Sequence, residues 1–183
     1  MRIIAGERRG LILKTVDFEG FRPTLARVKE SLFGILTPAL EGARVLDLFA
    51  GSGALGLEAI SRGAAKALFV DNNKLAIKAL EANINRCGFQ DRCRVVDGDF
   101  TLVGKRVARG EQFDLVFADP PYLQRFPQRV LNHVVESNLL APEGLLSLEM
   151  DKKEVAEFLS PVLTLIRDEK YGGTVIQIFR RNR

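Results

Sequence analysis

Short apolar runs alternate with segments of helical periodicity along most of the chain. Runs rich in Val, Leu and Phe and bounded by Gly, Asp or Pro predict buried strands at Arg44–Phe49, Ala67–Val70, Arg94–Val96, Phe113–Ala118 and Gly144–Glu149. Between them, apolar residues at helical spacing predict helices over Ala54–Ser61 and Lys74–Cys87, each followed by a glycine that can end a helix. This alternation predicts an α/β fold, a Rossmann-like and mostly parallel sheet with helices on both faces.

The carboxyl-terminal segment follows a different pattern. Two strand-like runs, Leu163–Lys170 and Thr174–Arg180, flank the pair Gly172-Gly173. Two glycines between strands are typical of a two-residue β-hairpin turn. We therefore expect the sheet to end in an antiparallel pair of strands.

The amino-terminal segment also differs from the body of the chain. Arg2–Ala5 and Leu11–Lys14 are short strand-like runs separated by a charged turn with a glycine at each end, which predicts a hairpin arm. Thr24 can then cap a helix with an apolar stripe formed by Leu25, Val28, Leu32 and Leu36. We expect residues 1–43 to form an extension of arm and helix, and residues 44–183 to form the main domain.

The composition limits the class of protein. The chain has 183 residues, of which 46% are hydrophobic and 27% are charged, and these values suit one globular domain. No apolar run approaches the roughly 18 residues of a membrane span, and the amino terminus lacks the apolar stretch of a secretory signal. Cys87 and Cys93 are too few and too poorly spaced for a zinc site, so we expect no metal. These features favour a cytoplasmic protein with no membrane partner.

The positive charge gathers at the two ends of the chain. Residues 1–44 carry eight basic and five acidic residues, and residues 180–183 include three arginines. Residues 45–179 hold 16 basic and 18 acidic residues, so the body is slightly acidic although the formal net charge is +4. Basic ends are compatible with nucleic-acid binding, which depends on where positive charge clusters, and also with a surface that only promotes solubility.

A glycine-rich loop follows the first predicted strand. Gly51, Gly53 and Gly56 match the pattern G-x-G-x-x-G between a strand and a helix, where glycines let the backbone turn and approach a ligand. Asp71 closes the next strand, 20 residues after Gly51, where a carboxylate can accept hydrogen bonds from ribose hydroxyls. The loop therefore predicts a nucleotide or nucleoside ligand at the carboxyl end of the first strand.

Two features favour S-adenosylmethionine over NAD as this ligand. Asp47 precedes the glycines, where a carboxylate would repel a pyrophosphate but suits a cationic aminoacyl group. A dehydrogenase also needs a substrate domain, for which 183 residues leave no room. We therefore expect S-adenosyl-L-methionine as cofactor and S-adenosyl-L-homocysteine as product, with an NAD-dependent oxidoreductase as the remote alternative.

An acidic turn follows the third predicted strand. Asp99 could accept a hydrogen bond from the adenine amino group and Phe100 could pack on the adenine ring, or the turn could simply cap a helix at Thr101. The residues that we assign to the cofactor site share a position directly after one of the first three strands: Asp47, Phe49, Ala50, Gly51, Ser52, Gly53, Asp71, Asn72, Asp99 and Phe100.

The tetrapeptide Asp119-Pro120-Pro121-Tyr122 follows the strand predicted at Phe113–Ala118. Two prolines make the segment rigid and leave its carbonyl groups without ladder partners. Asp119 and the Pro120 carbonyl can accept hydrogen bonds from an exocyclic amino group, while Tyr122 offers a flat face to a base. Catalysis then consists of holding the nitrogen about 3 Å from an activated methyl group and needs no general base. We therefore expect Asp119, Pro120, Pro121 and Tyr122 to be catalytic.

These stretches together resemble the class I S-adenosylmethionine-dependent methyltransferases and, more narrowly, the RsmD family. The matching segments run through most of the chain: Arg2–Gly6 with Arg9-Gly10, Arg22-Pro23-Thr24 with Arg27-Val28, Leu46–Glu58, Asp119–Tyr122 and Tyr171–Thr174. The tetrapeptide alone is also similar to that of adenine-N6 methyltransferases, so the amino-terminal arm carries the narrower resemblance. The resemblance implies a seven-stranded sheet with an antiparallel last strand, and residues 44–183 as the catalytic domain.

The resemblance also implies a substrate. It points to methylation of the exocyclic N2 of a guanine in 16S ribosomal RNA, presented within an assembling small ribosomal subunit among neighbouring ribosomal proteins. Methylation of adenine N6 in DNA or RNA is the alternative. We expect the protein to be a monomer.

Basic residues near the arm and the site are candidates for RNA contact. The residues assigned to RNA binding are Arg2, Arg8, Arg9, Arg22, Arg125 and Arg129. The last two flank Phe126 in a basic and aromatic loop that could hold flanking nucleotides, although a solvated loop fits the sequence as well. His133 is the only histidine, and we expect it to have a surface or packing role because the chemistry needs no base.

Overall fold

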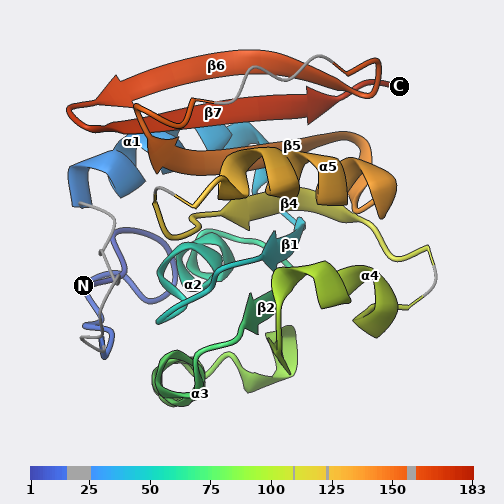
Figure 1. Ribbon diagram of the computed structural model, residues 1–183. Coiled ribbons are helices and arrows are strands. Elements are labelled where there is room, and N and C mark those ends of the chain that lie inside the picture. Colours follow the sequence, from blue (N-terminus) through green and yellow to red (C-terminus); the bar gives the residue numbers. More distant parts are fainter. Residues whose placement is uncertain (16–25, 109, 123, 156–159) are drawn as a thin grey trace.

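The computed structural model describes residues 1–15, 26–108, 110–122, 124–155 and 160–183. Within them the chain forms a seven-stranded sheet in the order β3-β2-β1-β4-β5-β7-β6 (Figure 1). The strands are β1 Arg44–Asp47, β2 Lys66–Asp71, β3 Cys93–Asp97, β4 Phe113–Ala118, β5 Leu140–Asp151, β6 Leu163–Tyr171 and β7 Thr174–Arg181. The helices are α1 Ala26–Leu36, α2 Ala54–Ser61, α3 Lys74–Cys87, α4 Val103–Arg106 and α5 Phe126–Glu136. The predicted cap Thr24 and its neighbours Arg22 and Leu25 lie outside the described residues.

The direction of the strands confirms the predicted sheet. β1 to β5 pair in parallel, whereas β7 is antiparallel to both β5 and β6. The β6–β7 hairpin turns at Gly172-Gly173, as predicted, and Gly172 has a positive φ of 65°. β5 begins at Leu140 rather than at Gly144, because the strand continues past a bulge where Glu143 has a φ of 63°.

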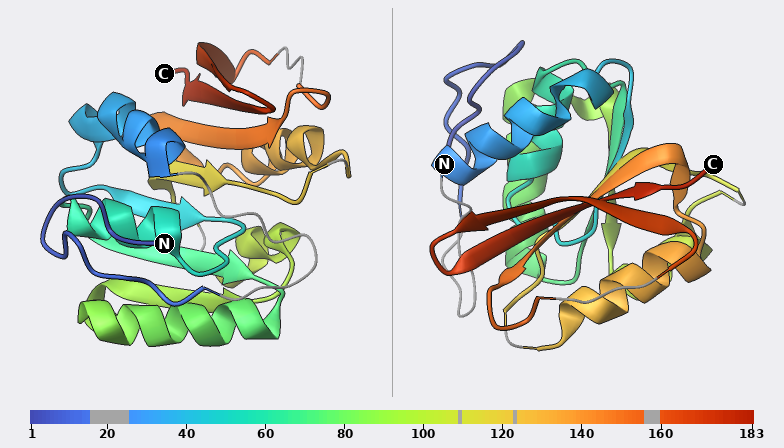
Figure 2. Two further views of the ribbon diagram at one scale, coloured as in Figure 1. Left: turned by 90° about the vertical axis from the view of Figure 1, so that its left-hand side faces the viewer. Right: turned by 90° about the horizontal axis from the view of Figure 1, so that it is seen from above.

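Two apolar layers cover the faces of the sheet. Side chains of α1, α2 and α3 pack on one face, in a cluster that includes Phe33, Leu57 and Leu80. Side chains of α4 and α5 pack on the other face, as Val103 and Val130 show. The view from above shows α1 and α5 on opposite sides of the sheet (Figure 2). No helix among the described residues is long and apolar enough to cross a membrane.

The amino-terminal arm is a short antiparallel hairpin that packs on the domain. Arg2 and Ile12 form an antiparallel bridge, which is flanked by hydrogen bonds from Ile3 N to Leu11 O and from Leu13 N to Met1 O at 2.9 and 3.0 Å. The backbone of Ile4 and Ala5 donates to the side chain of Glu58 in α2, at 2.8 and 3.0 Å. Ile3 and Leu13 are buried in the same cluster as α1 to α3. The predicted hairpin arm is therefore confirmed, although its limbs are too short to form extended strands.

Candidate active site

Three carboxylates follow neighbouring parallel strands at the same edge of the sheet. β1 ends at Asp47 and lies between β2 and β4. Asp47 pairs in register with Phe69 of β2 and Phe117 of β4. Asp71 and Asp119 each lie two residues beyond these partners, so all three acids stand at the carboxyl edge of the strands. This is the edge at which open α/β sheets bind their ligands.

The glycine loop requires glycine for two physical reasons. Gly51 and Gly53 have positive φ values of 53° and 83°, which other residues adopt at a cost. A Cβ on Gly53 would also approach Leu80 Cδ1 of α3 to 2.5 Å, and a Cβ on Gly56 would approach Phe69 Cε1 to 2.3 Å. The third glycine of the pattern therefore sets the contact of α2 with β2, while the first two shape the loop.

Asp71 holds the glycine loop against the start of α3. Its Oδ2 accepts from Gly51 N at 2.7 Å, and its Oδ1 accepts from Asn73 N at 2.8 Å. Asn73 in turn caps α3 by accepting from Leu75 N and Ala76 N. A carboxylate has about four acceptor positions, so Asp71 can bind the loop and still accept from two hydroxyl groups.

Asp47 lies beneath the loop rather than in it. Its side chain is 2% exposed, and Oδ2 accepts from Gly56 N at 3.1 Å. Burial raises the pKa of the Asp47 carboxyl to about 7; the hydrogen bond from Gly56 opposes this rise and the charge of Asp71 adds to it. The site thus contains one buried acid whose charge a cationic ligand would stabilise.

The other loop residues present mainly backbone. Ala50 and Ser52 are 6% and 2% exposed, whereas Phe49 is half-buried and Asn72 is exposed. Ala50 N donates to Val70 O at 3.0 Å, which ties the loop to the end of β2. The Phe49 side chain is therefore more accessible to a ligand than those of Ala50 and Ser52.

Asp99 has the capping role that was one of the two interpretations of the acidic turn. Asp99 caps the short helical turn that follows, because its Oδ1 accepts from the backbone N and the hydroxyl of Thr101. Burial opposes ionisation of Asp99, but the hydrogen bonds from Thr101 outweigh it and lower the pKa. Phe100 is 2% exposed and packs 5.1 Å from the Phe49 ring, centroid to centroid. The adenine contacts of both residues stay predictions.

The tetrapeptide after β4 is fixed by its tyrosine. Tyr122 donates to Oε1 of Glu149 in β5 at 2.9 Å, and its hydroxyl lies 3.0 Å from Thr174 Oγ1 of β7. Burial raises the pKa of Tyr122, the hydrogen bond with Thr174 opposes the rise, and the charges of Glu149 and Asp119 add to it. The hydroxyl therefore stays protonated and anchors the segment to the neighbouring strands. Pro120 is buried, while Asp119 is half-buried.

The predicted RNA-binding arginines divide into exposed and internally bonded ones. Arg2 and Arg9 are exposed, whereas Arg8 donates to Cys87 O at 2.6 Å. Arg125 and Arg129 are exposed at the start of α5, and the Arg129 guanidinium lies 5.0 Å from the Phe126 ring centroid. Arg22 lies outside the described residues.

His133 has a packing role. It is half-buried in α5, and its ring stands edge-on to Phe100 at 5.6 Å between centroids. Its Nδ1 lies 3.3 Å from Ser137 Oγ. Burial lowers the pKa of His133, while the charges of Glu136 and Asp99 oppose this.

Sequence reasoning missed a buried ionic network behind the loop. Glu58 in α2 is fully buried and binds Lys29 Nζ of α1 at 2.9 Å and Arg62 Nε at 2.7 Å. Lys29 is 2% exposed, and it also donates to Arg2 O in the arm. The sequence feature that could have indicated this network is Glu58 itself, the one acid in the mainly apolar segment Ala54–Ser61. The network joins the arm, α1 and α2, and so supports the helix that the glycine loop opens.

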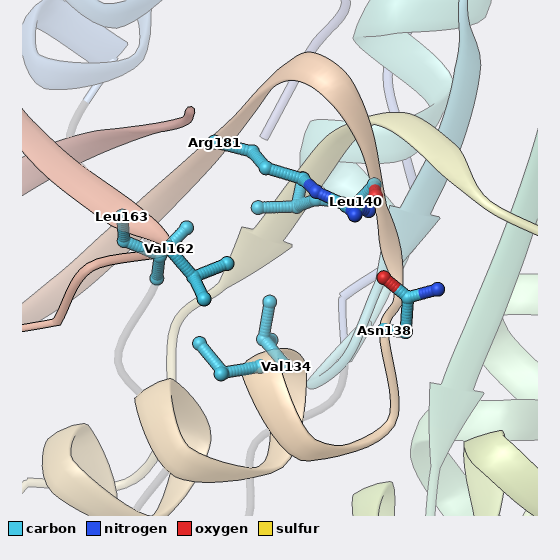
Figure 3. A pocket seen from close by; sticks show the side chains of 7 residues that line it. Val134, Asn138, Leu140, Val162, Leu163 and Arg181 are labelled. Atoms are coloured by element: carbon cyan, nitrogen blue, oxygen red, sulfur yellow. Dashed lines mark hydrogen bonds between the residues drawn. The ribbon is translucent and has the colours of Figure 1, made fainter. Parts of the chain in front are cut away.

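A small hollow lies away from these residues (Figure 3). Residues of α5, β5, β6 and β7 line it, among them Val134, Leu140 and Arg181. Leu140 pairs with Phe113, the first residue of β4, so the hollow lies at the amino edge of the parallel strands. It is therefore distinct from the candidate site.

The parallel strands, the reversed β7 and the glycine loop after β1 define a class I methyltransferase fold. The three carboxylates lie at the carboxyl edge of its sheet. A solved structure described as a putative methyltransferase from Escherichia coli superposes with a TM-score of 0.89 at 31% identity, covering 100% of this chain and 98% of that one. The expected fold class is confirmed.

A family model described as Conserved hypothetical protein 95 matches residues 1–180, and the chain belongs to this family. A putative rRNA methyltransferase, YlbH of Bacillus subtilis, is 36% identical over 99% of both chains. Ribosomal RNA small subunit methyltransferase D of Escherichia coli is 33% identical over 99% of this chain and 90% of the relative. These relatives confirm the resemblance to the RsmD family.

Proposed function

We propose that the protein transfers a methyl group from S-adenosylmethionine to the exocyclic N2 of a guanine in small-subunit ribosomal RNA, within an assembling small ribosomal subunit. The observation that carries the proposal is the position of Asp119 beside the glycine loop, after a strand that pairs directly with β1. The names of its relatives support ribosomal RNA as the substrate. The guanine N2 target rests on the resemblance of the arm together with the tetrapeptide.

The residues around the loop fit S-adenosylmethionine chemically. Asp71 has acceptor capacity for ribose hydroxyls beside its bonds to Gly51 and Asn73. Asp47 is a buried acid whose carboxylate accepts from the backbone of Gly56, and a cationic aminoacyl group would stabilise its charge. When bound, S-adenosylmethionine supplies an electrophilic methyl group.

The chain's own contribution is the position of the target amine. The carboxylate of Asp119 and the Pro120 carbonyl accept hydrogen bonds from the two N–H groups of the amine. The nitrogen lone pair then remains free to act as the nucleophile. Tyr122, fixed by Glu149 and Thr174, limits where the base can lie. Most of the rate enhancement comes from this orientation. Holding the reactants in the right geometry can lower the activation barrier by on the order of 7 kcal/mol or more.

The first test replaces the acceptor. Asp119→Ala should reduce methyl transfer from labelled S-adenosylmethionine to unmethylated small subunits by at least about 100-fold, since it removes one of two orienting acceptors. Calorimetric affinity for S-adenosylmethionine should change by less than about threefold. Asp168→Ala on the edge strand β6 is the matched control, because Asp168 is exposed and far from the site. Full activity of Asp119→Ala would contradict the mechanism.

The second test identifies the modified base. Nuclease digestion of the labelled RNA and chromatography should give N2-methylguanosine. N6-methyladenosine would favour the alternative substrate, and incorporation into duplex DNA but not into small subunits would refute a ribosomal role. Titration with NAD should give no heat of binding; tight NAD binding without S-adenosylmethionine binding would refute the proposed cofactor.

A further inference from the structure

Asn83 is a buried polar residue that the mechanism does not use. It lies in α3 with none of its side chain exposed. Its Nδ2 donates to Ser52 O of the glycine loop at 2.9 Å and to Lys14 O at the end of the arm at 2.9 Å. Its Oδ1 accepts from Lys14 N at 2.7 Å. One side-chain amide therefore joins two backbone segments that are far apart in the sequence.

The same region contains a second contact between arm and loop. Leu13 N donates to Met1 O at 3.0 Å, so the two limbs of the arm lie side by side near its base. Met1 Sδ lies 4.0 Å from the hydroxyl of Ser52. Figure 2 shows the arm running along α2 toward α3. The first limb of the arm thus contacts Ser52 directly, and the second limb reaches it through Asn83.

We propose that Asn83 is a positioning residue that couples the amino-terminal arm to the cofactor loop, so that docking of the arm at Lys14 and occupancy of the loop by cofactor support each other. The proposal rests on the proposed function only for the identity of the cofactor. It assigns to the arm an effect on the loop that is separate from any contact with RNA.

The coupling follows from the cost of leaving a buried amide without partners. When Lys14 moves away, Asn83 loses two of its three hydrogen bonds and the polar atoms stay buried. The side chain then shifts or admits water, and Ser52 O loses its donor. Coupling between two sites is reciprocal, so a cofactor that orders the loop also stabilises the docked arm.

The first experiment needs no cofactor. Lys14→Pro removes the backbone N–H that donates a hydrogen bond to Asn83 Oδ1. Lys14→Ala keeps this N–H and alters only an exposed side chain. In the cofactor-free protein, Lys14→Pro should increase hydrogen exchange of the Gly51–Gly53 amides about tenfold, and Lys14→Ala should not. Equal exchange in both variants, with circular dichroism showing that both are folded, would overturn the coupling.

The second experiment measures the cofactor. Asn83→Ala should weaken calorimetric binding of S-adenosylmethionine about tenfold, whereas Asn85→Ala, at an exposed asparagine of the same helix, should not. In the wild type, S-adenosylmethionine should slow exchange of the Lys14 amide, and in Asn83→Ala this protection should be lost. A purely structural role would lower the melting temperature but leave both the affinity and this protection unchanged.

The two experiments separate the possible failures. If S-adenosylmethionine does not bind the wild type, the proposed function fails and the exchange comparison of the two Lys14 variants still decides the coupling. If Asn83→Ala does not fold, the same comparison decides it. If the cofactor binds but neither the Lys14 variants nor Asn83→Ala change the loop, the coupling is refuted and the proposed function stands.

Discussion

At the scale of single residues, the three acids of the candidate site differ in how deeply they are buried. Asp71 and Asp119 are half-buried at the carboxyl edge, whereas Asp47 is almost fully buried under the loop. A carboxylate in that position is costly unless a cation or several donors compensate for its lost hydration. The pKa of about 7 at Asp47 is the consequence, and it links the stability of the protein to pH.

Asp47→Asn should stabilise the cofactor-free protein at pH 8. The folded state holds the Asp47 proton up to about pH 7, whereas in the unfolded chain the carboxyl has its ordinary pKa of 3.8. The folded state therefore binds more protons between these values, and the contribution of Asp47 to stability falls as pH rises. Asparagine carries no charge and can still accept from Gly56 N, so we expect a gain on the order of 2 kcal/mol in urea unfolding at pH 8.

The pH dependence distinguishes this effect from improved packing. The advantage of Asp47→Asn should be smaller at pH 5, where the wild-type carboxyl is protonated in the folded state. Asp168→Asn, at an exposed position, should show no such dependence. A constant difference at both pH values would contradict a titrating Asp47. The same substitution should weaken S-adenosylmethionine binding if the acid meets the cationic aminoacyl group.

The acids were predictable from sequence, but their buried partners were not. Asp47 and Asp71 stand next to a glycine pattern at the ends of predicted strands, so local sequence was sufficient. Asn83 and Glu58 each bind backbone groups of the arm, at sequence separations of 69 and 54 residues. No local pattern encodes such a partner, since any backbone group can satisfy a polar side chain.

At the scale of elements, the helices with glycine stop signals were predicted well. α2 and α3 have the predicted bounds, because each begins after a turn and ends at a residue followed by Gly or Arg-Gly. The arm was predicted as a hairpin from two strand-like runs around a charged turn, and its limbs do pair, with Ile3 N donating to Leu11 O. Its contact with α2 through Glu58 was not predictable, because this contact depends on the tertiary fold.

Gly56→Ala should destabilise the protein although alanine favours helices. A Cβ at Gly56 would lie 2.3 Å from Cε1 of Phe69, a ring with none of its surface exposed. Relief of this clash requires a shift of α2 against β2, so we expect a loss of about 2 kcal/mol in urea unfolding. The glycine is thus fixed by helix–sheet packing.

Gly34→Ala is the matched control for this prediction. Gly34 also lies within a helix, α1, but nothing lies within 4 Å of an added Cβ. Helix propensity then acts alone and should stabilise the protein by up to about 1 kcal/mol. If Gly56→Ala raised stability as Gly34→Ala does, the close packing of α2 on β2 would be refuted.

At the scale of the whole molecule, the carboxyl-terminal arginines and the turn of the arm lie away from the candidate site, whereas the base of the arm lies beside the glycine loop. Arg180 pairs with Leu145 across the sheet, so β7 ends at the amino edge of the parallel strands. Arg180 and Arg183 also lie 3.9 and 3.3 Å from Glu143, and Arg181 donates to Leu140 O. The turn of the arm reaches the same edge, because Arg8 binds the last residue of α3.

The position of the arm limits which of its arginines can contact RNA. The arm packs on α2, whose eight residues are all buried, so an RNA that enters at Asp119 and also reaches the turn of the arm would lie over the arm and not over α2 itself. Arg2 and Arg9 have exposed side chains for such a path, while Arg8 is engaged with Cys87 O. We therefore expect Arg2 and Arg9, rather than Arg8, to meet phosphates.

The salt dependence of RNA binding tests this expectation. The double variant Arg2→Gln and Arg9→Gln should weaken binding to unmethylated small subunits and flatten the plot of log affinity against log salt by about two units, roughly one per lost phosphate contact. Arg180→Gln with Arg183→Gln removes the same charge at the far edge and should leave the slope unchanged. Equal slopes for both double variants and the wild type would mean that the arm makes no phosphate contacts and only packs on α1, α2 and α3. A flatter slope in the arm variant alone would mean that the surplus charge acts where the exposed arginines of the arm lie, independently of the net charge of +4.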